Sequence, residues 1–263
     1  MSSPDELWQR VLAAPADADL KAQFVAALDQ AGDPRAKVFA LEALYQDLRK
    51  RDLPDNAALL KPDLDAALGD WRTQFALGAA AWPGQIQLVG AWPMELTINA
   101  ADFVRNAAAI VATIPLRHLN ITAISDAPAV FDVPQFEQIA SLDGSKQPWS
   151  DDAIRALAGS AHVGALRWID LSRGDISESQ VEILAASSAL KTVEVMNLTN
   201  NPTRDPVDAA AGYGTDWRTN RIVLESIYLP EFGSQLEARY GKIAWLNGLW
   251  NFLEDYPPSR YSF

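Results

Sequence analysis

The chain has few side chains that could carry out acid–base or metal chemistry. Its 263 residues include two histidines, His118 and His162, and no cysteine. A catalytic triad or a zinc site needs imidazole, carboxylate or thiolate groups that converge on one point. His118 alternates with Leu119 on a predicted strand and should point outward, whereas His162 falls in a predicted helix-to-strand loop. We therefore expect both histidines at the surface.

The carboxylates are not spaced as an acid–base pair. Asp151 and Asp152 are adjacent in sequence, as are Glu254 and Asp255, so on a helix their side chains point about 100° apart. The sequence contains no phosphate-binding Gly-x-x-x-x-Gly-Lys loop, no His-Glu-x-x-His helix and no Gly-x-Ser-x-Gly nucleophile turn. The sequence therefore predicts a protein that is not an enzyme, with no catalytic residue, cofactor or metal.

The charge balance narrows the class of partner. The chain has 34 acidic and 22 basic residues, a formal net charge of -12, which opposes the phosphate neutralisation that drives nucleic-acid binding. Its apolar stretches are too short for a membrane span, and its first residues lack the features of a secretory signal. We expect a cytoplasmic protein that binds neither nucleic acid nor membrane and that would attract a basic partner.

The elements that would position any site come from a near-repeat in the second half. Residues 166–171 and 190–195 both read Leu-x-x-φ-x-φ, where φ is aliphatic, and lie 24 positions apart. This is the strand pattern of a leucine-rich repeat. Further strands are predicted from Leu116, Phe136 and Leu224, and the steps between successive strands are uneven. The pattern predicts a short, irregular solenoid.

Helices are predicted before, between and after these strands. Apolar residues at spacings of three and four predict helices over 4–13, 19–31 and 35–51, and over 56–60 and 62–80 on either side of a proline. Alternating patterns predict strands at 85–89 and 95–99, and helices should follow at 100–113, 151–159, 178–187 and 236–253.

The fold class is α/β, with a helical domain over 1–82, a leucine-rich-repeat-like solenoid over 83–232, and a C-terminal helical cap and tail over 233–263.

Two stretches resemble a bacterial family. The segment from Leu7 to Leu41, above all the turn Gly32-Asp-Pro-Arg35, resembles the repeat-companion domain, a short helical module often found ahead of repeats. The segment from Ala100 to Leu119 is similar to the leucine-rich portion that commonly follows it. The resemblance covers roughly Leu7 to Leu229. It implies a repeat protein without established catalytic residues.

A surface for binding another protein is predicted on the inner curve of the solenoid. Aliphatic residues of each strand face the core, so the residues between them should stack into an exposed row. That row consists of Thr97, His118, Asn120, Trp168, Asp170, Ser172, Thr192, Glu194, Met196 and Tyr228. Exposed aromatic residues supply much of the binding energy at protein interfaces, and adjacent acids would attract a basic partner.

The predicted function is therefore a non-enzymatic protein–protein interaction module. A sharper hypothesis is an immunity protein that neutralises a cognate bacterial toxin, because acidic proteins can block basic enzymes by charge complementarity. One alternative is a structural subunit of a larger assembly. Another is a ligand-binding protein or enzyme that uses the loop over 201–214.

Overall fold

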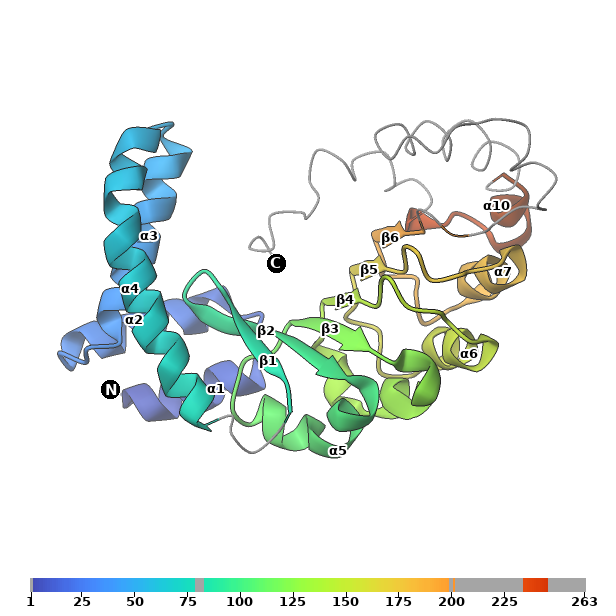
Figure 1. The fold of residues 1–263 in the computed structure, drawn as a ribbon, viewed down its shortest axis with the longest axis horizontal. Coiled ribbons are helices and arrows are strands. Elements are labelled where there is room, and N and C mark those ends of the chain that lie inside the picture. The colour runs from blue at the N-terminus through green and yellow to red at the C-terminus, as the bar shows by residue number, and fades with distance from the viewer. Residues whose placement is uncertain (1, 79–82, 199–200, 202–233, 246–263) are drawn as a thin grey trace. The chain divides into compact units, whose positions relative to one another are not determined.

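The computed structural model describes residues 2–78, 83–198, 201 and 234–245 (Figure 1). These residues form two compact units. The first contains Met1–Thr97 and Asn106–Arg117, and the second contains Ile98–Arg105 and residues from His118 onward. The fold is mixed α/β, as predicted: the described residues contain a hairpin of two antiparallel strands, followed by four strands that pair in parallel in chain order. The predicted domain limits at 82 and 232 stay predictions.

In the described residues, the first unit starts with four helices, and side-chain caps begin the first two. They are α1 (Pro4–Ala13), α2 (Ala18–Gln30), α3 (Ala36–Lys50) and α4 (Pro54–Gly78). Ser3 and Glu6 form a capping box at the start of α1, and Asp17 accepts a hydrogen bond from the Leu20 amide at the start of α2. Gly32, at φ +64°, turns the chain after α2.

Pro62 does not end a helix, which corrects the prediction of two helices over 56–60 and 62–80. It lies inside α4, which is continuous over 25 residues. A proline within a helix removes one backbone hydrogen bond and costs about 3 kcal/mol. Ala57 and Leu64 are buried on either side of it, and Trp71 is buried further along the helix. This burial offsets the local cost and keeps the helix intact.

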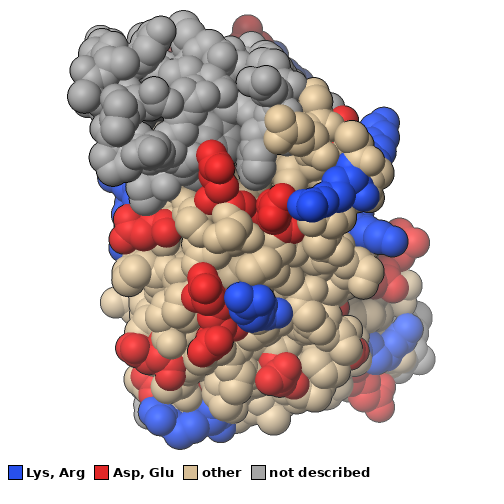
Figure 2. All heavy atoms as spheres, turned by 90° about the vertical axis from the view of Figure 1, so that its right-hand side faces the viewer, with Lys and Arg blue, Asp and Glu red and all other residues tan. Residues whose placement is uncertain are grey.

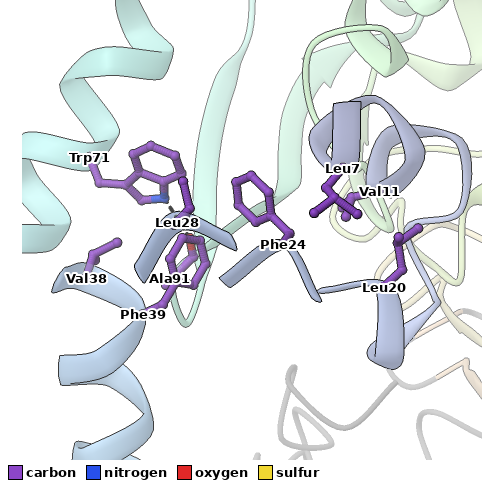
Figure 3. Packing of buried hydrophobic residues seen from close by; sticks show 9 residues of the cluster. All are labelled: Leu7, Val11, Leu20, Phe24, Leu28, Val38, Phe39, Trp71 and Ala91. Atoms are coloured by element: carbon purple, nitrogen blue, oxygen red, sulfur yellow. Dashed lines mark hydrogen bonds between the residues drawn. The ribbon is translucent and has the colours of Figure 1, made fainter. Parts of the chain in front are cut away.

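Aromatic residues dominate the core of the first unit. Phe24 and Phe39 meet edge to face with their ring centroids 6.0 Å apart, and Phe39 packs in the same way on Trp71 at 5.9 Å. The Trp71 indole N–H donates a 2.7 Å hydrogen bond to the Ala91 carbonyl (Figure 3). Ala91 follows Gly90 in the turn between β1 (Gln85–Val89) and β2 (Trp92–Asn99), so this bond fixes the hairpin to the helices.

The second unit is built from parallel strands that alternate with helices. Its strands are β3 (His118–Thr122), β4 (Ser141–Asp143), β5 (Trp168–Asp170) and β6 (Val195–Asn197). The main helices are α6 (Asp151–Gly159), α7 (Glu178–Ala186) and α10 (Ser234–Tyr240). Between β3 and β4 lie three short 3-10 helices, η2 (Ile124–Asp126), η3 (Pro128–Asp132) and η4 (Pro134–Gln138). Figure 1 shows α6 and α7 together on one side of the strands.

Helix α5 (Ala100–Val111) follows β2 and contributes residues to both units. The Asn99 side chain accepts a hydrogen bond from the Ala101 amide, as expected of a residue that caps a helix. The helix predicted over 100–113 is therefore confirmed apart from its last two residues.

Strand register gives the spacing of successive parallel strands. Leu119, Leu142, Ile169 and Met196 are paired from β3 to β6, and the steps between them are 23, 27 and 27. The predicted correspondence of Leu166 with Leu190, 24 positions apart, is therefore wrong, because Leu190 corresponds to Val163 and Val193 corresponds to Leu166. The predicted strand at Phe136 is also wrong: Phe136 lies in η4, and the strand begins later, at Ser141.

A left-handed turn and a serine helix cap recur at the spacing of the inward strand residues. Ala123, Lys146 and Arg173, each at the fourth position after an inward strand residue, all have φ between 55° and 60°. This left-handed conformation is uncommon for residues other than glycine. Ser150 and Ser177, separated by the same step as Ile169 and Met196, cap α6 and α7. Two successive stretches of chain thus share strand, turn and helix start.

The C-terminal helix is shorter than predicted. The sequence predicts a continuous helix over 236–253, but α10 ends at Tyr240, and Gly241 adopts φ +83°. Leu236 and Trp245, on either side of this break, are both buried. The remainder of the predicted cap lies outside the described residues.

Adjacent serines after α7 give a direct test of how successive turns of the chain are joined. The Ser187 hydroxyl donates to the Ala158 carbonyl in the last turn of α6 and accepts from the Ala189 and Leu190 amides, whereas Ser188 is exposed. Ser187→Ala should lower the free energy of unfolding by about 1–2 kcal/mol, because it leaves these groups without their partner. Ser188→Ala should change it by less than about 0.5 kcal/mol. Urea denaturation measures both; equal effects would contradict this role.

Candidate functional site

A polar row crosses the strands of the second unit. Asn120, Asp143, Asp170 and Asn197 are paired in register from β3 to β6, each directly after the inward residue of its strand. Side chains alternate along a strand, so this row lies on the sheet face opposite the inward residues. We call it the strand-face row. It holds two carboxylates side by side at its centre.

The two carboxylates of the strand-face row have different surroundings. Asp170 is 2% exposed, accepts hydrogen bonds from the Asn197 side-chain amide at 3.0 Å and the Ser172 backbone amide at 2.8 Å, and is therefore held in one orientation. Asp143 is half-buried and accepts from the Ser145 backbone amide at 3.0 Å. The two carboxylates lie directly opposite each other on neighbouring strands.

A second row runs beside it, through His118, Ser141, Trp168 and Val195. The His118 Nδ1 and Ser141 Oγ atoms lie 2.7 Å apart. A histidine–serine contact can transfer a proton when a substrate lies against the hydroxyl. It also simply satisfies two polar groups that burial has removed from water. His118 is 6% exposed, so the prediction that it lies at the surface is wrong.

The structure brings together only part of the predicted binding surface. His118, Trp168, Asp170, Ser172 and Met196 are buried. Thr97 and Asn120 are half-buried, Thr192 and Glu194 are exposed, and Tyr228 lies outside the described residues. The prediction that Met196 faces outward is wrong, because the register makes it the inward residue of β6.

Several residues on this surface were missed by the sequence prediction. Ser141, Asp143, Val195 and Asn197 belong to the two rows, but Val195 was predicted to face the core and the other three lay outside the predicted strands. The pattern that could have found them is Val193-x-x-Met196-x-Leu198-x-x-Asn201, which matches the longer leucine-rich-repeat pattern that ends in asparagine.

Asn201 links two successive turns of the chain. Its Oδ1 accepts from the Gly174 and Ile176 amides at 2.7 and 3.1 Å, and its Nδ2 donates to the Leu171 and Leu198 carbonyls at 3.0 and 2.9 Å. Gln147 occupies the corresponding position after β4. Its side chain donates to the Ile121 carbonyl and accepts from the Ile124 amide. These amides fix the loops that border the strand-face row.

The exposed charges of the second unit are mixed. Glu194 is 63% exposed at its side chain, and one of its oxygens lies 3.8 Å from the Arg167 guanidinium. Arg239 of α10 pairs with Glu182 of α7 at 2.8 Å. Figure 2 shows acidic side chains spread over the visible described surface, with basic side chains between them. Acidic and basic side chains are therefore mixed on the exposed surface in this view.

Among the described residues, no group of three or more histidine or acidic side chains is arranged to hold a metal ion. Within the same part of the chain, no helix has the length and apolar character needed to cross a membrane. Comparison with protein-family models, characterised proteins and solved structures finds no match to this chain.

Proposed function

We propose that the second unit is a short leucine-rich-repeat solenoid and that the chain is a repeat-companion-type protein that binds another protein. The recurring features support this proposal: the near-constant step between inward residues, a shared left-handed turn, and an asparagine that bridges two loops. Repeats of this kind stack their strands into an extended face that is commonly used for binding.

The partner we propose is basic, and the role is not enzymatic. Asp143, which is half-buried, and the exposed Glu194 just before β6 give this part of the strand face an acidic character, in a chain with net charge -12. The sharper version is a cytoplasmic immunity protein that covers the basic surface of a toxin domain. A structural subunit remains the alternative, and a role for the loop over 201–214 concerns residues outside the described part except Asn201.

The test is site-specific crosslinking in the native cell. A photoreactive side chain at Thr122 or Glu194, both exposed at the strands, should crosslink to one basic protein, whereas the same group at Asp152 on α6 should not. Crosslinks from Asp152 alone, or to acidic proteins, would contradict the proposal.

Charge reversal gives the quantitative prediction. Glu194→Lys should weaken binding of the crosslinked partner, after its purification, by about tenfold or more at low salt, and less at high salt because salt screens the attraction. Asp152→Lys makes the same charge change on α6 and should leave the dissociation constant within about twofold. Titration calorimetry at two salt concentrations measures both. A salt-independent affinity, or equal losses in the two variants, would rule out an acidic strand-face contact.

A further inference from the structure

An open apolar groove lies in the first unit, between α2, α3 and the β1–β2 turn. Its volume is about 650 Å³. Its floor contains Phe39, Ala91 and Trp92, and its walls carry alanines at helical spacing, Ala22 and Ala26 on α2 and Ala36, Ala40 and Ala43 on α3. Ala22, Ala26, Ala40 and Ala43 are exposed. Solvent-facing helix positions usually carry polar side chains, so these walls are unusually smooth and apolar.

The size and openness of the groove suit a helix better than a small molecule. Small-molecule sites enclose most of their ligand. This groove is open along its length, and Lys21 and Asp29 on one wall are separated by about 12 Å along the helix axis. That is the length of two turns, over which a docking helix presents three or four apolar residues. Alanine walls also permit the close approach of a second helix backbone.

Charge at the groove is arranged with opposite signs. Lys21 lines the groove with its ammonium 3.4 Å from the Met94 sulfur and 5.3 Å from the centre of the Trp92 ring. Among the described residues, no carboxylate lies within ion-pair distance of Lys21, although the chain is strongly acidic. Asp29 lies two turns further along α2, and Glu42 lines the wall formed by α3. A ligand would therefore need an anionic group at one position and a cationic group at another.

The electrostatics of Lys21 support an anionic partner. Burial, and secondarily the positive charge of Arg117, lower the pKa of Lys21 to about 8. An isolated ammonium in such surroundings is less stable than one in water, and a carboxylate brought beside it would relieve that cost.

We propose that this groove binds an amphipathic helix of a partner protein, with an acidic residue against Lys21 and a basic residue about two turns away against Asp29. The apolar face of that helix packs on Phe39 and Trp92 between the two alanine walls. This site is separate from the strand-face row and does not depend on the function proposed for it.

A pair of synthetic helical peptides tests the proposal on the full chain. Each is about four helical turns long, with leucines along one face and one glutamate and one lysine two turns apart beside it; the second peptide exchanges the two charges. One of the two peptides should bind about tenfold more tightly than the other. Once the apolar face lies in the groove, only one order of the two charges places glutamate at Lys21 and lysine at Asp29. Titration calorimetry gives both dissociation constants.

Substitutions then locate the contact. Ala26→Arg should abolish binding of the tighter peptide, whereas Ala66→Arg, at an exposed alanine of α4, should leave it unchanged. Lys21→Met should reduce the ratio of the two dissociation constants to less than about threefold. If apolar contacts alone held the peptides, this substitution would not change that ratio. No binding of either peptide at millimolar concentration, equal binding of both by the unmodified chain, or full binding by the Ala26→Arg protein would overturn the proposal. Circular dichroism verifies that each variant keeps its helices.

Discussion

Asn201→Ala should lower the free energy of unfolding of the second unit by about 3 kcal/mol, a large effect for one partly buried polar side chain. The substitution removes four hydrogen bonds at once and leaves the Gly174 and Ile176 amides and the Leu171 and Leu198 carbonyls without this partner. Each polar group deprived of its partner costs about 1 kcal/mol or more when water cannot reach it easily. Urea denaturation, followed by circular dichroism, measures the loss.

Two further variants calibrate this effect within the same protein. Gln147→Ala removes two equivalent bonds, to Ile121 and Ile124, and should cost about half as much. Asn201→Asp keeps the acceptor but replaces the donor with an oxygen that faces two carbonyls, so it should be at least as damaging as alanine. If Asn201→Asp proved harmless, the asparagine would not be bridging the two loops through both ends of its amide.

A recurring strand could be predicted from the sequence, but its phase could not. Leu166 and Leu190 share a local pattern, and the step between them falls in the range expected of leucine-rich repeats. Both are buried, so burial alone does not separate the alternatives. The pairing of Ile169 with Met196 does, and it places Leu190 in the loop before the strand, where it fills the core as Val163 does.

That shift of phase explains most of the errors at the candidate site. With Met196 inward, Val195 and Asn197 move to the strand face, and Thr192 and Glu194 move to the approach to the strand. Trp168 and Asp170 come from the strand whose inward residue, Ile169, was predicted correctly, and they lie in the two rows that cross the strands. Their burial could not be predicted, because the strand pattern tells which face a residue lies on and not what covers that face.

Local signals predicted the helices better than the strands. Capping residues such as Ser3, Ser150 and Ser177 set helix starts that the structure confirms, because a cap acts on amides within the next turn. Pro62 led to the prediction of a helix boundary that the structure does not have. The tendency of proline to interrupt a helix is a local effect, and the burial of residues along α4 overcomes it. Glycine at 241, by contrast, ended a helix that the apolar pattern predicted to continue.

Lys21→Met should stabilise the first unit at neutral pH by about 2 kcal/mol. Burial and the charge of Arg117 lower the pKa of Lys21 to about 8 from the 10.5 of a free lysine. Below pH 8 the side chain is protonated in both states, so the folded protein bears the full cost of the buried charge. A shift of this size corresponds to about 3 kcal/mol, which partial contact with solvent reduces to about 2 kcal/mol by screening. Methionine keeps a favourable contact with the Trp92 ring through its sulfur, so little packing is lost.

The pH dependence of that difference distinguishes charge from packing. Between pH 8 and 10.5 the unfolded chain binds more protons at this position than the folded one, so the stability of the unmodified protein rises relative to that of the variant. The gain from Lys21→Met should therefore be constant well below pH 8, shrink through this interval and vanish near pH 10.5. Urea denaturation of both proteins across the range measures it, and their other titrating groups cancel in the difference. A gain that does not change with pH would mean that methionine merely packs better. A gain that falls as predicted would identify Lys21 as a charge kept at the expense of stability, as expected of a residue that meets a carboxylate in the groove.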